Sequence, residues 1–431
     1  MTPTQNDNFR FGADAEAGPP EPLGEAAYHG LAGEVVRRIE PETEADPVAL
    51  LLIFLVVFGN VIGRSAHFLV SGGRHAANLF LALVGATSAG RKGTASSGIM
   101  SVFRHIDPDY CDHCVTSGLS SGEGLIQAVR DAVVLTQNDR REQRNIPPDP
   151  GVRDKRLLVL EEEFARPLKT MQRIGNTLSP LLRLGWDGQT LKTMTKRPMV
   201  ATEPHLSLNV QISKTELAHH LNTIESAGGL GNRILFAWVK RSKCLPDGGS
   251  LDDQLLQPLV DRLVTAVQFA SQVGEVVRSP AADEIWREVY PRLSAGRPGL
   301  YGALTARAAP QALRLAMIYA LLDHNDFVRP EHLMAALEVV RFCDDSVKFI
   351  FGDRIGDPIA DRILEALRDA GAAGLTRSDI SELFQRNRTQ NEIENGLEVL
   401  REHGLATWRE EETPGRSAQR WFSLDAPVVT R

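Results

Sequence analysis

The sequence predicts an α/β fold with a mainly parallel β-sheet. Short apolar segments alternate with helical stretches between residues 78 and 245, and this alternation is typical of parallel strands joined by helical crossovers. The first strand, at residues 78–86, leads directly into a glycine-rich turn, and another, at residues 156–164, contains three consecutive glutamates. Further strands are expected at residues 205–213 and 232–240.

Length and composition indicate a globular protein of two or three domains. The chain has 431 residues, of which 42% are hydrophobic and 24% charged, so it can bury a sizeable core. Its formal charge of −7 argues against a surface coated with cations, although a local basic channel can still contact phosphates. Four cysteines are too few to cross-link so long a chain, which indicates a reducing compartment and a cytoplasmic protein.

The amino-terminal part of the chain predicts a tail followed by helices. Residues 1–26 are acidic and rich in glycine and proline, so we expect a disordered tail. Residues 27–77 form a helical segment, in which Asp46 caps a helix that begins at Pro47. The apolar run at residues 51–63 is shorter than the roughly 20 residues that span a bilayer. We therefore expect a buried core helix and no membrane segment.

Two further regions follow the predicted core at residues 78–245. Residues 250–352 are almost wholly helical by their amphipathic pattern. Residues 358–425 predict three helices and a two-stranded hairpin, an order typical of a winged helix, with helix caps at Thr376 and Asn387. Such a module contacts either DNA or protein, and the sequence leaves both open.

The glycine-rich turn at residues 84–94, VGATSAGRKGT, is a candidate phosphate site. Backbone N–H groups of such a turn surround phosphates, a lysine reaches the terminal phosphates, and a Ser or Thr hydroxyl binds Mg²⁺. Here Arg91 occupies the usual lysine position, and Lys92 and Thr94 follow late, so a plain tight turn is the alternative. The candidate nucleotide-binding residues are Gly85, Ser88, Gly90, Arg91, Lys92, Gly93 and Thr94.

The glutamates of RLLVLEEEF are the candidate metal and water residues. A carboxylate at the carboxyl edge of a sheet can hold the magnesium shell, and its neighbour can polarise the attacking water. Because neighbouring residues of a strand face opposite sides, we expect Glu162 to activate water and Glu161, with Thr94, to hold Mg²⁺. The alternative is a charged strand end that leads into a solvated helix.

Two other residues are weaker candidates. Glu123, in the small-residue turn SSGEG, is a further catalytic carboxylate or else a helix-capping residue. Arg233, in GGLGNRILF, can reach the phosphates of a neighbouring subunit and offset transition-state charge, or it pairs with a local carboxylate.

Cys111 and Cys114 form a CxxC motif, but zinc needs four ligands, and we expect a turn with two buried thiols. Lys192, Lys196 and Arg197 lie in a polar loop that is either a DNA-contacting loop or plain surface.

The motifs GRKGT, SSGEGLI, LVLEEEF, LSPLLRLGWDGQTL and GLGNRILF occur in an order that resembles a RecA-like P-loop ATPase family of formerly unknown function. That family occurs in phages, plasmids and integrated elements, is related to replicative helicases, and is often associated with primase-polymerase domains. The resemblance covers roughly residues 45–350. It implies phosphate binding by Gly90, Lys92, Gly93 and Thr94, metal or water roles for Glu161 and Glu162, and an arginine role for Arg233.

The resemblance also implies a RecA-like core that assembles into a homo-oligomer, such as a hexameric ring, because these motors place ATP between protomers. The expected function is an ATP- and Mg²⁺-dependent motor of the helicase kind that acts on single-stranded or forked DNA in replication of a mobile element. Any primase that it serves is a separate chain. The alternatives are a nucleotide-gated DNA-binding regulator with weak turnover and, less favoured, a structural adaptor.

Overall fold

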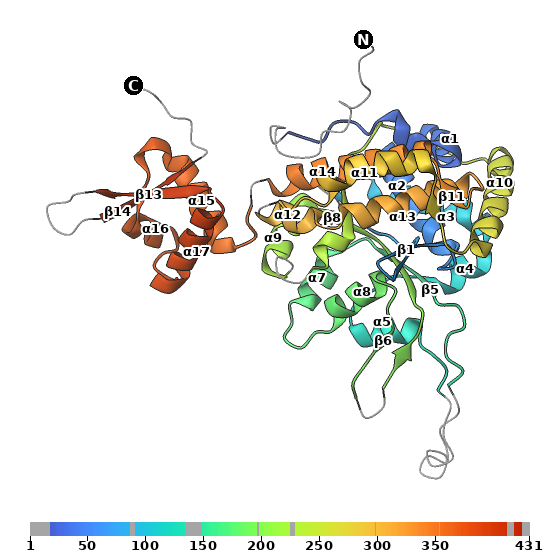
Figure 1. Ribbon diagram of the computed structural model, residues 1–431, viewed down its shortest axis with the longest axis horizontal. Helices are drawn as coiled ribbons and strands as arrows, with labels where there is room; N and C mark the ends of the chain where they lie inside the picture. The colour runs from blue at the N-terminus through green and yellow to red at the C-terminus, as the bar shows by residue number, and fades with distance from the viewer. Residues whose placement is uncertain are drawn as a thin grey trace, which may run out of the picture.

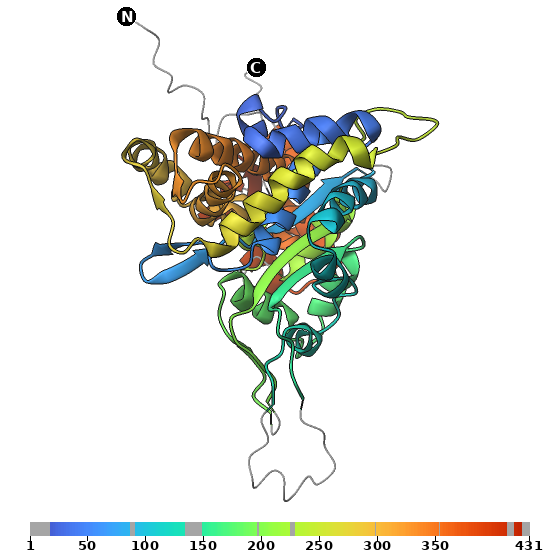
Figure 2. The same ribbon diagram turned by 90° about the vertical axis from the view of Figure 1, so that its right-hand side faces the viewer.

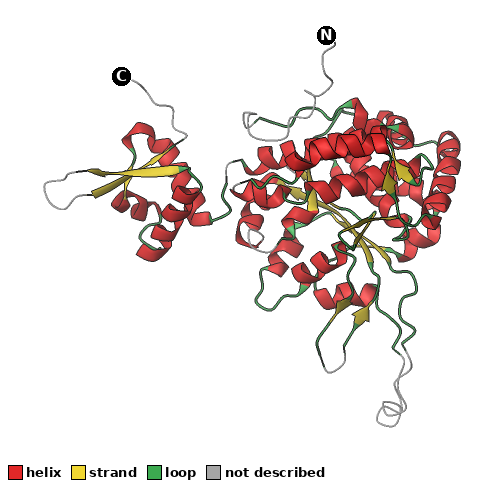
Figure 3. Ribbon diagram, in the orientation of Figure 1, coloured by secondary structure: helices red, strands yellow, loops and turns green. Residues whose placement is uncertain are grey.

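The centre of the protein is a five-stranded parallel sheet with the order β4-β5-β8-β3-β9 (Figures 1 and 3). The computed structural model describes residues 18–86, 91–133, 149–195, 198–224, 229–297, 299–352, 354–411 and 418–424. The strands are β3 (Phe80–Gly85), β4 (Val115–Thr116), β5 (Arg156–Glu161), β8 (His205–Ser213) and β9 (Ile234–Trp238). The α/β class and the parallel sheet predicted from the sequence are therefore confirmed.

The four predicted strands all occur, with small differences at their ends. β8 matches its predicted bounds, and all of its residues except Ser213 are buried, as expected for a parallel strand covered on both faces. β5 ends at Glu161, three residues earlier than predicted, because Phe164 already caps the next helix. The edge strand β4 has only two residues and has no pattern that the sequence analysis detected.

Helices cover both faces of the sheet. Ile99 of α3 (Lys92–Ile106) packs in one core cluster with Leu81 and Leu83, whereas Leu217 of α9 (Lys214–Ile224) packs in another with Phe80. α10 packs on α3, as Figure 2 shows. The first cluster also contains residues of α2 (Pro47–Val61), α10 (Asp253–Gln272) and α13 (Ala308–Leu322). The second cluster also contains residues of α5 (Gly122–Ala128), α8 (Leu178–Trp186) and α12 (Gly299–Thr305). The long helix α14 (Pro330–Phe351) contributes residues to both clusters.

The strand order creates a switch point beside β3. After β3 the chain runs through α3 to the far edge strand β4, returns through β5 and β8, and then crosses through α9 to β9 on the other side of β3. The connections that leave β3 and β8 therefore lie on opposite faces of the sheet. In open α/β sheets, ligands bind at the carboxyl ends of the strands at such a point.

The amino-terminal segment is helical, as predicted, up to α2. It contains η2 (Glu25–Tyr28), α1 (Gly30–Ile39), η3 (Glu40–Glu42) and α2, whose cap is the predicted Asp46, with Pro47 in the first turn. Every residue of α2 after Pro47 is buried, and no described helix has the length and apolarity that a bilayer crossing requires.

The prediction that the helical segment extends to residue 77 is wrong beyond α2, because β1 (His67–Val70) and β2 (Gly73–Ala76) form an antiparallel hairpin. Gly63, at a φ of +73°, follows the end of α2, and Gly72, at +80°, lies in the hairpin turn. Both φ values favour glycine.

The region at residues 250–352 is helical, as predicted, and shares its core with the amino-terminal segment. Besides α10, α12, α13 and α14 it contains α11 (Pro280–Leu293). Two further pairs of short strands were not predicted. β10 (Val277–Arg278) pairs with β11 (Phe327–Val328) in this region, and β6 (Leu191–Lys192) pairs with β7 (Val200–Ala201) before β8.

The carboxyl-terminal part, which begins at α15, has a core cluster of its own and stands apart from the sheet (Figure 1). The predicted cap Thr376 is confirmed, but the second cap is Thr389 rather than Asn387, because Thr389 forms a capping box with Glu392. The predicted turn residues Pro414 and Gly415 lie outside the described residues. The elements are α15 (Pro358–Ala370), η6 (Gly371–Ala373), β12 (Leu375–Thr376), α16 (Arg377–Leu383), α17 (Gln390–Glu402), β13 (Ala406–Glu411) and β14 (Ala418–Ser423), with the sheet order β12-β14-β13.

Candidate functional site

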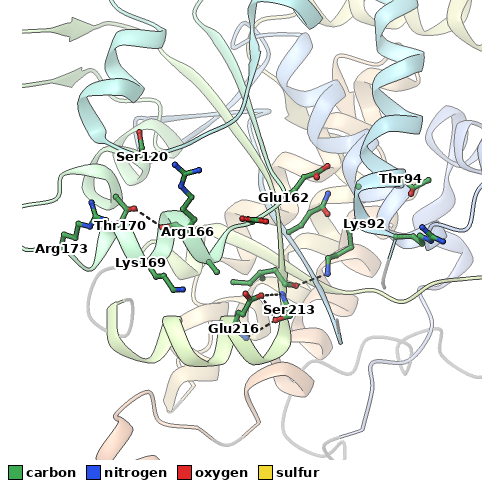
Figure 4. A pocket seen from close by; sticks show the side chains of 16 residues that line it. Lys92, Thr94, Ser120, Glu162, Arg166, Lys169, Thr170, Arg173, Ser213 and Glu216 are labelled. Atoms are coloured by element: carbon green, nitrogen blue, oxygen red, sulfur yellow. Dashed lines mark hydrogen bonds between the residues drawn. The ribbon is translucent and has the colours of Figure 1, made fainter. Parts of the chain in front are cut away.

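A cavity of about 900 Å³ opens at the carboxyl edge of the sheet, beside the switch point (Figure 4). Its walls come from the amino end of α3, the residues after β5, one face of α7 (Ala165–Met171) and the carboxyl end of β8. The volume lies within the range of roughly 300–1,000 Å³ that is typical of small-molecule sites.

The amino end of α3 places Lys92 and Thr94 in this cavity. Lys92 is the first residue of α3 and is only 7% exposed, and its Nζ donates to the carbonyl oxygen of Ile212 at 3.4 Å. Burial lowers the pKa of the Lys92 amino group. Thr94 is exposed in the first turn of α3, where unpaired backbone N–H groups and the helix dipole favour an anion.

Arg91, at the usual lysine position, is bound to the amino-terminal segment. Its Nε lies 2.7 Å from Glu44 Oε2, and Glu44 also pairs with Arg241 and accepts a hydrogen bond from the N–H of Leu245. This ion pair leaves Lys92 as the better candidate for a phosphate. Gly85 is the last residue of β3, whereas the predicted Ser88 and Gly90 lie outside the described residues.

Glu162 follows β5 and lies against the first turn of α3. A Cβ atom added to Gly93 would lie 3.0 Å from Glu162 Oε1, so glycine at this position allows the close approach of the carboxylate. Glu162 lines the cavity together with Lys92 and Thr94 (Figure 4). The structure therefore brings together the predicted water-activating residue and the predicted phosphate residues.

Glu161 is not placed as its predicted magnesium role requires. Its Oε2 accepts hydrogen bonds from the backbone N–H groups of Gly118 and Leu119 at 3.0 and 3.1 Å, so the carboxylate anchors the loop before α5. It lines a second cavity of about 610 Å³ but not the larger one that contains Lys92 and Thr94. The geometry therefore favours Glu162 over Glu161 as the carboxylate beside the amino end of α3.

Glu123 and Arg233 line neither of these two cavities. Glu123 accepts a hydrogen bond from Thr177 Oγ1 at 3.3 Å, and the residue that caps α5 is Ser121 rather than Glu123. The side chain of Arg233 is 9% exposed and pairs with Asp187 at 2.7 Å, at the amino edge of the sheet. This arrangement favours the local-carboxylate interpretation of Arg233 over a role in a neighbouring subunit.

The cations of α7 and of the turn after it, and one residue of β8, were not predicted from the sequence. Arg166 and Lys169, three residues apart on α7, and Arg173, in the turn after this helix, all line the larger cavity. Gln211, at the end of β8, is 5% exposed and donates from Nε2 to Ser96 Oγ at 3.3 Å. The three cations are visible in the sequence, but only the fold shows that they line the same cavity as Lys92.

The predicted thiols of the CxxC motif are buried and free. Cys111 lies in α4 (Pro108–His113), and Cys114 is the residue that ends this helix. Burial raises the pKa of the Cys111 thiol, and burial raises the pKa of the Cys114 thiol to about 12. Among the described residues, the only cluster with three or more candidate metal ligands contains no cysteine. Lys192 lies in β6, and Lys196 and Arg197 are outside the described residues.

Comparison with models of known protein families and with curated protein sequences finds no match for this chain.

Proposed function

We propose that the larger cavity binds and hydrolyses a nucleoside triphosphate, ATP, with Mg²⁺. The observation that carries this proposal is the convergence of Lys92, the amino end of α3 and Glu162 at the carboxyl edge of the sheet, beside the switch point. A strand, a glycine-bearing turn and a helix with lysine in its first turn are the parts of a P-loop. The proposed fold is accordingly a RecA-like P-loop core.

The charge of the cavity supports an anionic ligand. Five cationic and three acidic side chains line it, so the lining carries a formal charge of +2. Of the three acids, Glu216 is held by Ser213 Oγ at 2.7 Å, and this hydrogen bond lowers its pKa. The cations are Arg91, Lys92, Arg166, Lys169 and Arg173, and the acids are Glu162, Glu163 and Glu216.

Each residue has a definite role in the proposal. Lys92 contacts the terminal phosphates, and the Thr94 hydroxyl would hold Mg²⁺, which when bound neutralises charge on the phosphate oxygens. Glu162 accepts a hydrogen bond from the attacking water and orients it. Gln211 fixes Ser96 on α3 and so helps to hold the helix against β8.

The proposed work of this hydrolysis is movement along DNA, in replication of a mobile element, by an oligomer such as a hexameric ring. The order of the sequence motifs and the RecA-like arrangement support this part of the proposal. The alternative is a nucleotide-gated DNA-binding regulator with weak turnover. The ion pair between Arg91 and Glu44 favours that alternative, because the residue at the usual lysine position is already paired with a carboxylate that does not line the cavity.

We propose that the carboxyl-terminal unit is a winged helix that contacts protein rather than duplex DNA. Several of its exposed arginines lie in ion pairs, among them Arg377 with Glu394 at 2.6 Å and Arg388 with Glu392 at 3.0 Å. The exposed surface of α17 adds Glu398 and Glu402. A helix that enters a major groove needs cations near phosphates, and these acids oppose that contact.

The test is ATP turnover with and without single-stranded DNA, together with strand displacement on a forked duplex. Lys92→Ala should abolish turnover, and Glu162→Gln should abolish turnover while a fluorescent ATP analogue still binds. DNA-stimulated turnover with strand displacement supports the motor, whereas tight binding without turnover supports the regulator. Normal hydrolysis by Glu162→Gln would show that the role assigned to Glu162 is wrong.

A further inference from the structure

An arginine beside the terminal phosphate accelerates phosphoryl transfer, and the structure offers a candidate for this arginine other than Arg233. Negative charge spreads over the terminal-phosphate oxygens during the reaction, and an arginine from the same chain or a neighbour offsets it. The side chain of Arg233 is 9% exposed and bound to Asp187, and it lines neither cavity at the carboxyl edge. An arginine that acts in this site must be one of those that line these cavities.

Arg166 is placed where such an arginine is needed. It lies in the first turn of α7, four residues after Glu162. Among the described residues, four line both cavities at the carboxyl edge, namely Glu162, Glu163, Arg166 and Gln211. Arg166 thus shares the junction of the two cavities with the proposed water-orienting carboxylate. Figure 4 shows it on the wall opposite Lys92, with Glu162 between them.

The guanidinium of Arg166 is available for a ligand. Within the part of the chain that the structure describes, no carboxylate lies within ion-pair distance of it, although Glu162 and Glu163 line the same cavities. The guanidinium of Arg91, by contrast, already forms an ion pair with Glu44 of the amino-terminal segment. Arg166 is also exposed, so a bound anion can reach it without unfolding the helix.

We infer that Arg166 is a catalytic residue that acts in cis, donating hydrogen bonds to the terminal phosphate that Lys92 holds. This inference rests on the proposed function of the cavity and adds to it that one chain supplies the complete set of reacting groups. A guanidinium presents several N–H donors in a planar fork that matches phosphate oxygens.

The chemical step balances without a further reactant. The water oxygen forms a bond to the terminal phosphorus and gives a proton to the Glu162 carboxylate, which then releases it to solvent. The bond between the terminal phosphorus and the bridging oxygen breaks, and the nucleoside diphosphate leaves with that electron pair. Arg166 transfers no proton and only stabilises the charge on the phosphate oxygens.

The first test compares Arg166→Ala and Arg166→Lys with the full-length wild type. Arg166→Ala should lower turnover by about 10³-fold, the lower end of the effect of such arginines, and change the affinity for a fluorescent ATP analogue by no more than about threefold. Arg166→Lys should fall in between, since it keeps the charge but loses the fork. Arg287→Ala is the control, because Arg287 is an exposed arginine of α11 that lines neither cavity.

The second test separates action in cis from action in trans. Mixing Arg166→Ala with Glu162→Gln should leave turnover as low as in either variant alone, because every site then carries one defect. Restored turnover in the mixture would place the guanidinium in a neighbouring copy and overturn the inference. Turnover of Arg166→Ala close to that of the wild type overturns the inference alone, whereas a wild type that neither binds nor hydrolyses ATP overturns the proposed function with it.

Discussion

Gly93→Ala should separate the stability of α3 from the chemistry of the cavity. Gly93 lies in the first turn of α3, and its added Cβ would lie 3.0 Å from Glu162 Oε1, whereas ordinary van der Waals contact begins at 3.4 Å. The carboxylate must therefore move by about 0.4 Å. A displacement of 1 Å in a catalytic group can cost about 100-fold in rate, so a shift of about 0.4 Å should cost about sixfold, or about 1 kcal/mol.

The folded state should respond in the opposite direction. Alanine is favoured over glycine in a helix by up to about 1 kcal/mol, so the variant should unfold at an equal or higher denaturant concentration. Gly98→Ala is the matched control on the same helix, because its Cβ would meet only Ile39 at an ordinary 3.7 Å. The assays are turnover at saturating ATP and equilibrium unfolding in urea. If Gly93→Ala turns over ATP as fast as Gly98→Ala, the assignment of Glu162 to the reacting water is refuted.

Three further outcomes follow from the contacts of single residues. Glu161→Gln should keep turnover within about threefold of wild type, since the carboxylate anchors a loop; a loss of 100-fold or more, about 2.7 kcal/mol, would restore its magnesium role. The hydrogen bond to Asp323 raises the pKa of His29, so this pair's stabilisation should be complete below pH of about 6.5 and lost as pH rises through the raised folded-state pKa. Urea unfolding at several pH values should show this loss in wild type, and an equal loss in His29→Gln would contradict it. Arg233→Ala should destabilise the fold by about 2 kcal/mol, because Asp187 loses its close, charge-assisted hydrogen bond and keeps only the 3.6 Å ion pair with Arg307, while the folded fraction retains turnover; lost turnover in fully folded protein would show that Arg233 acts in catalysis.

The strands of the sheet could be predicted because their apolar runs are long enough to show buried, parallel pairing. β8 is predicted to the residue, and β4 is not, since two residues carry no pattern. The cap of α17 was misplaced because Asn387 and Thr389 both suit a cap, and only the side-chain bond of Thr389 to Glu392 decides between them.

The site was predictable in part. The proximity of Lys92 and Glu162 follows from the meeting of carboxyl ends in a parallel sheet, which the motifs indicated. Alternation along β5 also predicts that Glu161 and Glu162 face opposite sides. It does not predict which of them faces α3, because the face that α3 covers depends on packing between segments far apart in the sequence. The burial of Arg233 depends on Asp187, 46 residues away, and such a pairing has no local signal.

The contacts of the Glu44 carboxylate bear on the affinity of the cavity for an anionic ligand. It holds Arg91 at the start of α3, Arg241 beyond β9 and the backbone of Leu245 at once. Arg91, at the amino end of α3, is thereby restrained by a contact outside the cavity before any anion arrives. Because this residue is already restrained, an arriving phosphate does not have to supply that conformational entropy, and more of its interaction energy remains for affinity.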